Sequence, residues 1–572
     1  MIPTTHIATD VLVVGSGAAG MYAAIEAARA GCRVFLIDRS LIGRGGATVM
    51  AQMTVAAAVG EQTPDHWKHH LADTLKAGRG LCDPALSRLL CEDGVECIRE
   101  MDAWGVGWAR VPAAGDAPAK GLRAVMAPGH DRPRCVYVDF LNTGPAVSRT
   151  LRTQVIRTPG IRRVGELVVT DLAMREGRCA GAIAMHAPTS KVVSIAAKAT
   201  IIATGGLTRL YRRNSASANM GGDGYALALR AGAELIDMEF VQFFPIGHLA
   251  PRLIGMDPIM WDPFRYKLGG RLLNGEMQEF TERYGMAESG TYIVTRDLAT
   301  YAITKEVEAG RGSPHGGAYL SFRHCDAAEL RAAFGPVIAR LAKQGIDLTR
   351  DAIEVAPIAH YHMGGIRVDT RMATAVPGLY AAGEAVGGAN GANRLSGNAI
   401  TEAFAFGRAA GRSAAAAVAK PGAAPWDGAL SAAEAALASG VARTLPFNPA
   451  AMLVKLQALM ADDVGAFRTA AGLTRALEHL SAMRATQGEF PPRAGDSFDA
   501  ARLDWLDLRN MLLVAETVAR AALLRTESRG AHQREDHPGL ETHWAVNQVV
   551  TLKAGALGIT QRPVPQAKEA HA

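Results

Sequence analysis

The chain has 572 residues, of which 49% are hydrophobic and 20% are charged, an ordinary globular composition that leaves no segment obliged to be disordered. This length exceeds what a single core supports and suggests roughly three or four domain-sized units. The formal net charge is +6, without a block of about five or six like charges, which weakens a nucleic-acid interpretation. Such a surface fits an anionic substrate equally well, or has no role beyond solvation.

The cysteines argue against a metal centre. The 7 cysteines are scattered and none forms a C-x-x-C pair, so neither zinc nor an iron–sulfur cluster is expected within this chain. An odd, scattered set favours reduced thiols in a cytoplasmic protein. Residues 1–10 show neither the basic start nor the apolar run of a signal peptide, and no transmembrane span is expected. Contact with the inner face of a membrane would come through partner subunits.

The N-terminal segment carries a complete nucleotide-binding pattern. Residues 10–14 form a short apolar run that predicts a buried parallel strand. Gly15-Ser16-Gly17-Ala18-Ala19-Gly20 follows directly, then an Ala-rich helical stretch over 21–31, a second strand over 32–37, and Asp38. Strand, G-x-G-x-x-G, helix, strand and acid stand in the order and spacing of a dinucleotide-binding fold.

Each part of this unit has a physical role. Gly15 allows the tight turn, Gly17 lets the backbone approach a pyrophosphate, and Gly20 lets the helix pack closely on the strand. The helix N-terminus offers N–H groups and a positive dipole end, and Asp38 can accept hydrogen bonds from ribose hydroxyls. A lone glycine motif is weak evidence, because many glycine-rich turns bind nothing, but the complete unit is much stronger. It does not by itself separate NAD from FAD.

Two later strands favour FAD. The segment 198–206 reads as a strand that ends in Ala-Thr-Gly-Gly, and the segment 378–384 reads as a strand that ends in Gly-Glu. Strands that return to the nucleotide from distant parts of the sequence are typical of FAD domains, which must enclose a much larger cofactor.

Further sequence blocks carry a family resemblance. They are N-M-G-G-D-G at 219–224, D-M-E-F-V-Q-F at 237–243, H-Y-H-M-G-G-I at 360–366, G-A-N-R-L-S-G-N at 391–398 and R-T-E-S-R-G-A-H-Q-R-E-D at 525–536. In this order the blocks closely resemble the flavoproteins of succinate dehydrogenase, fumarate reductase and L-aspartate oxidase. The resemblance runs from about residue 10 to residue 538, nearly the whole chain.

The resemblance implies an α/β fold: a Rossmann-like FAD-binding domain, an inserted α+β capping domain and a C-terminal helical domain. The FAD-binding domain would comprise residues 1–245 and 351–415, and the capping domain residues 246–350. An Ala/Pro/Gly-rich connector over 414–425 would lead to the helical domain, 426–540, where the apolar spacing of 453–460 and 503–524 independently predicts helices. The tail, 541–572, has little periodicity and is expected to be exposed.

The resemblance also implies where FAD binds. Glu384 would bind the ribityl chain, since a buried acid after a strand is rarely idle. The loop 396–400 would present backbone N–H groups to the flavin ring, where negative charge collects on reduction. Asp223 would lie near the adenosine part, although an acid in a glycine-rich turn can simply cap a helix. The complete implied set is Gly15, Gly17, Ala18, Ala19, Gly20, Asp38, Arg39, Gly46, Ala47, Thr48, Ala203, Thr204, Gly205, Asp223, Glu384, Arg394, Ser396, Asn398 and Ala399.

The catalytic set carried over by position is Arg296, His360 and Arg394. Arg296 would donate or accept the proton opposite flavin N5, a role that suits a side chain with a pKa above about 12 facing a carbanion-like centre. Without the family, an arginine at a helix start is usually only solvated. His360 and Arg394 would clamp a substrate carboxylate, because arginine offers a bidentate fork and histidine a directed donor.

One departure from the family concerns the cofactor's attachment. The family links its flavin covalently through a histidine that precedes a Thr-Val or Ser-Val step, and Ala47 occupies that place before Thr48. We therefore expect FAD to be bound without a covalent bond.

Other departures concern the substrate. Phe244 stands where the family has a substrate-binding histidine, and the segment 262–270 replaces the usual Thr-Glu…Arg-Gly-Glu-Gly residues, including the glutamate that relays protons. Aromatic residues come instead, namely Trp261, Phe264 and Tyr266. Plain succinate or fumarate is therefore doubtful as a substrate. Side chains that could restore the second clamp are His248, Arg265 and Lys267.

The leading functional hypothesis is an FAD-dependent dehydrogenase or reductase that moves a hydride between flavin N5 and a carbon of a carboxylate-bearing substrate. Electrons would then pass through a partner, for which an iron–sulfur subunit is the natural candidate. The alternative is a stand-alone, L-aspartate-oxidase-like enzyme that uses oxygen or a soluble acceptor. In a third interpretation the chain only passes electrons or binds a partner, but the retained Arg296, His360 and Arg394 argue against it.

Overall fold

The computed structural model describes residues 5–52, 54–112, 120–139, 141–251, 253, 259–261, 268–284, 296–419, 426–441, 444–493 and 497–566. The chain divides into two compact units. Unit 1 comprises Met1–Arg212, Ala216–Val241 and Tyr361–Ala572, and unit 2 comprises Arg213–Ser215 and Gln242–His360. Unit 2 covers the region for which the sequence predicts a capping domain.

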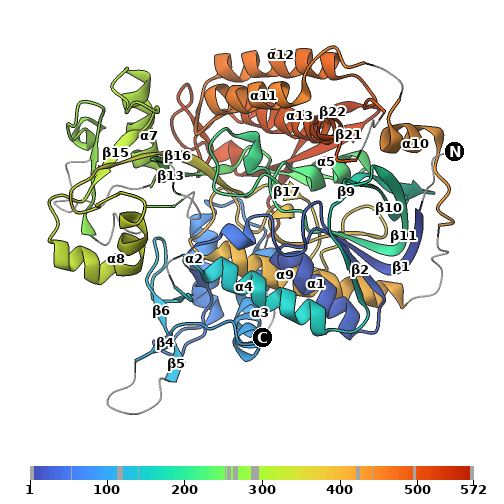
Figure 1. Cartoon of the computed structure of the whole chain (residues 1–572), viewed down its shortest axis with the longest axis horizontal. Helices are drawn as coiled ribbons and strands as arrows, with labels where there is room; N and C mark the ends of the chain where they lie inside the picture. The colour runs from blue at the N-terminus through green and yellow to red at the C-terminus, as the bar shows by residue number, and fades with distance from the viewer. Residues whose placement is uncertain are drawn as a thin grey trace. The chain divides into compact units, whose positions relative to one another are not determined.

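Unit 1 contains a 7-stranded sheet, of which β1, β2, β9, β10 and β11 are seen on the right in Figure 1. Its parallel strands run in the order β8-β2-β1-β11, with β18 also paired to β11, and β10 and β9 continue the sheet in antiparallel fashion. The strands are β1 (Thr5–Val14), β2 (Val34–Ile37), β8 (Ile161–Val164), β9 (Leu167–Arg175), β10 (Arg178–His186), β11 (Lys191–Ile202) and β18 (Leu379–Ala381). In register, Val14 pairs with Ile37 and with Ile202, so these parallel strands end side by side. This is the predicted Rossmann-like arrangement.

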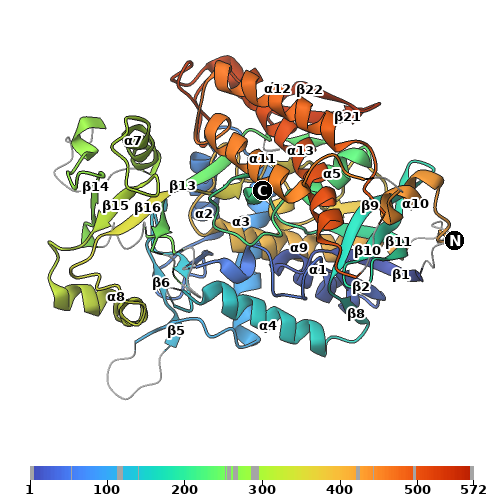
Figure 2. The ribbon, with the colours of Figure 1, turned by 45° about the horizontal axis from the view of Figure 1, so that its top comes forward.

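Helices rich in small residues pack against this sheet. In both views α1, α4 and α9 lie together beside it (Figures 1 and 2). A Cβ at Gly407 of α9 would lie 2.5 Å from the Ala19 carbonyl oxygen, and one at Gly411 would lie 2.4 Å from that of Ala23. The helices can therefore approach closely only because these positions lack side chains. The helices of this part are α1 (Ala18–Arg29), α2 (Trp67–Ala77), α3 (Pro84–Ala103), α4 (Thr143–Arg157), α5 (Asp223–Arg230) and α9 (Asn398–Val418).

The predicted C-terminal helical domain is present. In both views α11, α12 and α13 lie side by side (Figures 1 and 2). A helix forms there as the apolar spacing predicts, but α13 is buried on all sides over Trp505–Leu508 and Asn510–Ala515 rather than on one face. The helices are α10 (Ala432–Ser439), α11 (Pro449–Asp463), α12 (Ala470–Gln487) and α13 (Ala500–Leu524).

The predicted exposed tail is instead a hairpin built into unit 1. Strand β21 pairs on one side with β22 and on the other with β12, which in turn pairs with β17. Asn547, Gln548, Val549 and Val550 are all buried on β21. The expectation of an exposed tail is therefore wrong for residues 547–550, whereas the turn at 553–556 is exposed and no residue of β22 is buried. Periodicity missed the strand because two of the buried side chains are amides, which Asp237 and Glu239 satisfy by hydrogen bonds. The strands are β12 (Leu235–Ile236), β17 (Gly365–Ile366), β21 (Val546–Lys553) and β22 (Ala556–Pro563).

Short elements complete unit 1. Strands β3, β7 and β6 form a small sheet, and β4 with β5 and β19 with β20 form separate pairs. The strands are β3 (Val55–Ala56), β4 (Arg110–Val111), β5 (Lys120–Leu122), β6 (Ala124–Val125), β7 (Cys135–Val136), β19 (Phe467–Arg468) and β20 (Gln533–Arg534). Turns of 3₁₀ helix are η1 (Thr48–Met50), η2 (Thr208–Leu210), η4 (Gly383–Ala385) and η5 (Thr542–Trp544).

Unit 2 is a mixed α+β unit, as predicted. Its 4-stranded sheet has the order β13-β16-β15-β14. The segment Arg213–Ser215 joins this sheet, because Asn214 forms a parallel bridge with Ala359 of β16. The elements are β13 (Val241–Ala250), β14 (Arg271–Leu273), η3 (Thr281–Tyr284), α7 (Arg296–Glu308), β15 (Ala318–Ser321), α8 (Ala327–Ala342) and β16 (Ile353–His362).

Neither a membrane-spanning helix nor a metal centre is found among the described residues. None of their helices combines the length and the apolar character needed to cross a membrane. Nor do these residues contain a cluster of metal-ligating side chains.

A buried ion cluster ties the hairpin to the rest of unit 1. Arg525, fully buried, donates to Glu239 (2.6 Å) and to Glu527 (2.9 Å), and also to the carbonyl oxygens of Trp544 and Val546 (both 2.9 Å). Removing the arginine would leave Glu239 and Glu527 as buried acids with fewer donors.

We therefore expect Arg525→Met to lower the free energy of unfolding by about 3–5 kcal/mol. A matched control is Arg520→Met on α13, which removes a half-exposed pair with Glu516 and should cost less than about 1 kcal/mol. Urea midpoints of the two variants test this, and equal midpoints would show that the cluster is not structural.

Candidate active site

The glycine loop sits where three chain segments meet. Gly15 has φ +104, a conformation that favours glycine, and a Cβ there would lie 2.3 Å from the carbonyl oxygen of Ala203 after β11. A Cβ at Gly20 would lie 1.9 Å from the Gly15 carbonyl oxygen. The N-terminus of α1 at Ala18 therefore lies directly against the ends of β1 and β11, and its N–H groups and dipole suit a phosphate.

Asp38, which the sequence predicts to bind a ribose, joins the glycine loop to the residues after β2. One carboxylate oxygen accepts from the N–H and the hydroxyl of Ser16 (both 2.7 Å), and the other accepts from the N–H and the hydroxyl of Ser40 (both 2.8 Å). The sequence analysis did not single out either serine. The ribose contact of Asp38 stays a prediction.

The predicted segment of Gly46, Ala47 and Thr48 lies beside the same helix end. The Thr48 hydroxyl accepts from the Ala18 N–H at 3.0 Å, and the Gly46 N–H donates to the Ser217 hydroxyl at 2.8 Å. Gly46 has φ +80, and a Cβ there would meet no atom within 4 Å. Thr48 of this segment thus contacts the N-terminus of α1, whereas the space next to Gly46 is open.

The strand ends bring together the predicted residues of two distant segments. Ala203, Thr204 and Gly205 follow β11, and Glu384 follows β18, its parallel neighbour. A Cβ at Gly206 would lie 2.4 Å from the Glu384 carboxylate, so the segments are in direct contact. The carboxyl ends of parallel strands are the usual ligand edge of such a sheet.

Glu384 is half-buried and anchored from several sides. Its carboxylate accepts from the His362 N–H at 3.1 Å, and its carbonyl oxygen accepts from the Tyr225 hydroxyl at 2.7 Å. Burial raises the pKa of Glu384 to about 8, and the nearby Glu402 acts in the same direction. A hydrogen bond from a hydroxyl group would stabilise the carboxylate form of Glu384, which is consistent with the predicted ribityl contact.

Asp223 does not cap a helix. It is the first residue of α5, but Gly222 is the N-cap residue and no side chain caps the helix. The Asp223 carboxylate accepts from Arg39 at 2.9 Å and from Asn510 at 3.0 Å, and Arg39 also donates to Asp507 at 2.7 Å. Helix α13 thus holds Arg39 and Asp223 through Asp507 and Asn510, two residues that the sequence did not point to.

The predicted flavin loop forms the start of α9. Gly397 takes φ +83 as the N-cap residue, and Asn398 is the first helical residue. The Asn398 side chain hydrogen-bonds His70 (2.8 Å) and Thr74 (3.1 Å) of α2, and the Ser396 carbonyl oxygen accepts from His130 at 2.7 Å. These contacts hold a helix N-terminus, with its positive dipole end, in a fixed position.

The predicted catalytic residues are divided between the units. Arg394 belongs to unit 1, where it is 5% exposed and its guanidinium lies 4.5 Å from the centroid of the Tyr361 ring. Arg296, the first residue of α7, and His360 belong to unit 2. The side chain of Arg296 lies outside the described part of the structure. The joint action of the three stays a prediction.

His360 is held by groups of its own unit. Its Nδ1 atom hydrogen-bonds the Ser215 hydroxyl at 2.8 Å, and its ring meets the ring of Phe244 edge-on, with centroids 5.3 Å apart. Phe244 is 5% exposed and packs with Met260 and Ile358. A partner at Nδ1 fixes the ring's orientation.

Both ring nitrogens of His248, a candidate to bind a second substrate carboxylate, are hydrogen-bonded within unit 2. Its Nδ1 accepts from the Trp261 indole N–H at 3.1 Å, so a neutral ring carries its proton on Nε2, which donates to the Pro251 carbonyl oxygen. The side chain is 7% exposed. The other candidates, Arg265 and Lys267, and the aromatic residues Phe264 and Tyr266 lie outside the described residues.

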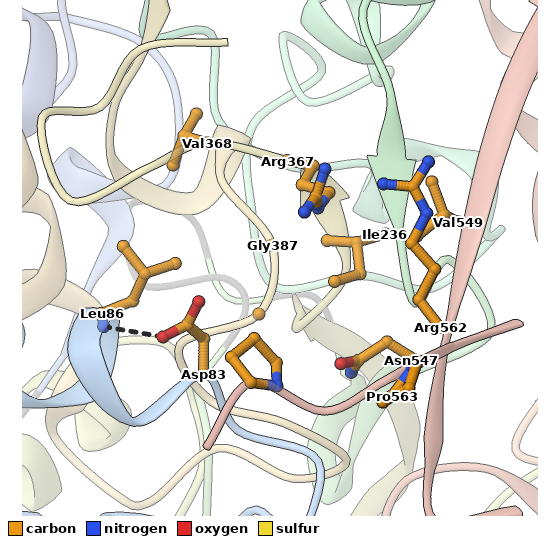
Figure 3. A pocket seen from close by; sticks show the side chains of 12 residues that line it. Asp83, Leu86, Ile236, Arg367, Val368, Gly387, Asn547, Val549, Arg562 and Pro563 are labelled. Carbon is orange, nitrogen blue, oxygen red and sulfur yellow. Dashed lines mark hydrogen bonds between the residues drawn. The ribbon is translucent and has the colours of Figure 1, made fainter. Parts of the chain in front are cut away.

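A separate cavity of about 240 Å³ lies beside the hairpin (Figure 3). The two arginines that line it, Arg367 and Arg562, both donate to Glu234, at 2.7 Å and 2.6 Å. Asp83, also in the lining, caps α3 by accepting from the N–H groups of Ala85 and Leu86. These charges are satisfied within the protein, so the cavity is not the candidate active site.

Comparisons with known proteins identify the family of the chain. The FAD binding domain family matches residues 10–400, and the fumarate reductase flavoprotein C-terminal family matches residues 454–569. One chain of the CoM/CoB fumarate reductase of Methanothermobacter marburgensis is 34% identical, over 94% of this chain and 95% of its own length. The L-aspartate oxidase of Streptomyces coelicolor is 34% identical, over 96% of this chain and 92% of its own length. Mycobacterium smegmatis Sdh1 in complex with UQ1 has a TM-score of 0.87 at 34% identity, over 98% of this chain and 95% of that one.

The fold and the loop thus define an FAD-binding oxidoreductase. The chain belongs to the flavoprotein family of succinate dehydrogenase and fumarate reductase, which includes L-aspartate oxidase. The residues present fit FAD: the close backbone cradle at Gly15 and Gly20 suits a pyrophosphate, and the buried Thr204 hydroxyl has no hydrogen-bond partner among the described residues.

Alanine substitutions at Gly17 and Gly20 can distinguish an effect on the stability of the fold from an effect on FAD affinity. A Cβ at Gly17, where φ is −66, would meet only the Thr48 hydroxyl, at 3.5 Å. We expect Gly17→Ala to leave the unfolding of the FAD-free protein within about 0.5 kcal/mol of wild type. It should weaken FAD binding at least ~10-fold, because its methyl group would occupy the approach to the pyrophosphate.

The matched variant is Gly20→Ala, whose methyl group meets backbone within the protein itself. It should destabilise even the FAD-free protein by about 1–3 kcal/mol. Urea unfolding and FAD titration measure both effects. Unchanged FAD affinity in Gly17→Ala would show that the pyrophosphate does not approach this residue.

Proposed function

We propose that this FAD-dependent oxidoreductase acts on a substrate with one carboxylate and an apolar remainder. When bound, FAD supplies a hydride donor or acceptor at its N5 atom. The observation that carries the proposal is the surroundings of His360: Phe244 packs against its ring, and His248 is already bonded to Trp261 and Pro251. An ionised carboxylate without a partner costs several kcal/mol when buried. Neither Phe244 nor His248 therefore offers a ready clamp to a second carboxylate.

In this proposal the chain's own residues have separate tasks. Arg394 and His360 bind the substrate's carboxylate, since both are donors with directed N–H groups. Ser215 holds the His360 ring through Nδ1. Arg296 transfers the proton to or from the substrate carbon.

We further propose that electrons are exchanged through an iron–sulfur partner subunit, in which case the chain would reach a membrane only through partners. The alternative is a stand-alone enzyme that uses oxygen or a soluble acceptor, as the similarity to L-aspartate oxidases suggests. Rapid reoxidation of the reduced, isolated chain by oxygen would favour the alternative. Slow reoxidation that an added one-electron dye accelerates would favour a partner.

The cofactor should be released by acid. Ala47 offers no nucleophilic side chain at the family's attachment position, so we propose that FAD is bound without a covalent bond. After acid precipitation the yellow colour should appear in the supernatant. Colour that stays with the pellet would mean that another residue forms the link.

Arg296→Gln should keep FAD and lose turnover of the carbon substrate at least about 100-fold, the usual lower range for loss of a general acid–base. A control on the same helix is Lys305→Gln, which removes the pair with Glu308 and the contact with the Tyr301 ring at the other end of α7. Steady-state turnover and flavin content are measured on both variants. Normal turnover of Arg296→Gln would remove Arg296 from the mechanism.

Succinate and fumarate should be poor substrates, with kcat/KM below about 10⁴ M⁻¹s⁻¹. Phe244→His restores the family's side chain and should raise kcat/KM for these dicarboxylates at least ~10-fold, about the 1.4 kcal/mol of one added hydrogen bond to a charge. Met260→Leu, which conserves volume in the same apolar cluster, should not. Efficient turnover of succinate by the wild type would show that another residue clamps the second carboxylate.

A further inference from the structure

Glu402 is a buried acid that the cofactor site does not account for. It lies on α9, one turn after Asn398, and is 1% exposed. One of its carboxylate oxygens accepts from the Tyr361 hydroxyl at 2.5 Å and from the Asn390 side-chain amide at 2.6 Å. A short hydrogen bond from a neutral donor to a carboxylate is a strong one, so Glu402 fixes the position of the Tyr361 ring.

The Tyr361 ring in turn supports Arg394. The guanidinium carbon lies 4.5 Å from the ring centroid, within the range of a cation–π interaction. Both residues are almost fully buried, at 3% and 5% exposure. A phenol that donates to a carboxylate becomes richer in electrons, because hydrogen bonds polarise one another in a low dielectric. Glu402 therefore strengthens the attraction between the ring and the guanidinium.

The charges around Glu402 make this arrangement sensitive to pH. Burial raises the pKa of Glu402 to about 7, while the hydrogen bonds from Tyr361 and Asn390 and the charge of Arg394 lower it. Other ionisable groups that interact with it are Glu384 and Tyr225. Because the folded-state pKa is raised, the carboxylate is ionised above this value and neutral below it.

We propose that Glu402 is a positioning residue for Arg394, acting through Tyr361 to hold the guanidinium charged and in place for the substrate's carboxylate. The inference rests on the proposed role of Arg394. Glu402 itself touches neither substrate nor flavin in this account; it sets the place and the charge of the group that does.

The test measures Arg394 directly in the FAD-loaded protein. Phenylglyoxal modifies neutral guanidine groups, and mass spectrometry of the peptide that contains Arg394 gives the rate. Glu402→Gln keeps an acceptor for Tyr361 but removes the charge, and we expect Arg394 to react about 3–10-fold faster at pH 8, a difference of up to about one pKa unit. Tyr361→Phe removes the hydrogen bond and keeps the ring, and it should also react faster, which provides the comparison if Glu402→Gln does not fold.

The pH profile distinguishes this role from a merely structural one. The ratio of the Glu402→Gln rate to the wild-type rate should grow from pH 6 to pH 8, as Glu402 ionises in the wild type. The matched control is Glu26→Gln on α1, which also removes the charge of a buried acid. Glu26 accepts from Arg412 at 2.6 Å, and Arg412 lies about 15 Å beyond Glu402 along α9. The Arg394 rate of this variant should equal that of the wild type.

Equal rates in wild type and Glu402→Gln across this pH range would overturn the inference. Failure of the proposed function looks different: Arg394→Gln would then turn over its carboxylate substrates with unchanged KM, whatever the modification rates of Glu402→Gln. The two results are independent.

Discussion

The whole of unit 1 depends on a contact between backbone atoms that no side chain could replace. Gly20 of α1 lies against the carbonyl oxygen of Gly15, and Gly15 lies against that of Ala203 at the end of β11. This packing sets the start of α1, with the N–H groups and positive dipole end of its first turn, beside two strand ends. The Ala- and Gly-rich faces of α1 and α9 continue the same close packing, which is why small residues dominate both helices.

Charged side chains hold the glycine loop and the segments next to it in these positions. Asp38 bonds the glycine loop to the residues after β2, and Arg39 links Asp223 to Asp507 on α13. The C-terminal helices are thus part of the cofactor site's support. Elsewhere in the unit, Tyr361 lies between two charged residues: its hydroxyl donates to Glu402 and its ring contacts the Arg394 guanidinium. Several charged groups near the glycine loop are thus paired with one another or with backbone N–H groups.

The sequence predicted the parts of this structure that rest on local patterns. The glycine loop, the returning strands before Gly205 and Glu384, and the C-terminal helices follow from spacing and hydropathy. Residues whose role depends on distant partners, such as Asp507 and Glu402, gave no local signal, since an acid on a helix usually faces solvent. The hairpin at 546–563 was missed because buried amides read as polar surface. The catalytic set rests on family resemblance, and its members fall in different units.

The most direct test of the account compares acids that differ only in a second carboxylate. Butyrate and succinate, and likewise larger pairs with branched or aromatic remainders, are mixed with the FAD-loaded protein without oxygen, and bleaching of the flavin is followed. The account predicts bleaching by at least one monocarboxylate with an apolar remainder, at rates far above those of the matched dicarboxylate. Bleaching by succinate with no response to any monocarboxylate would contradict it, because the surroundings of Phe244 and His248 would then not exclude a second charge.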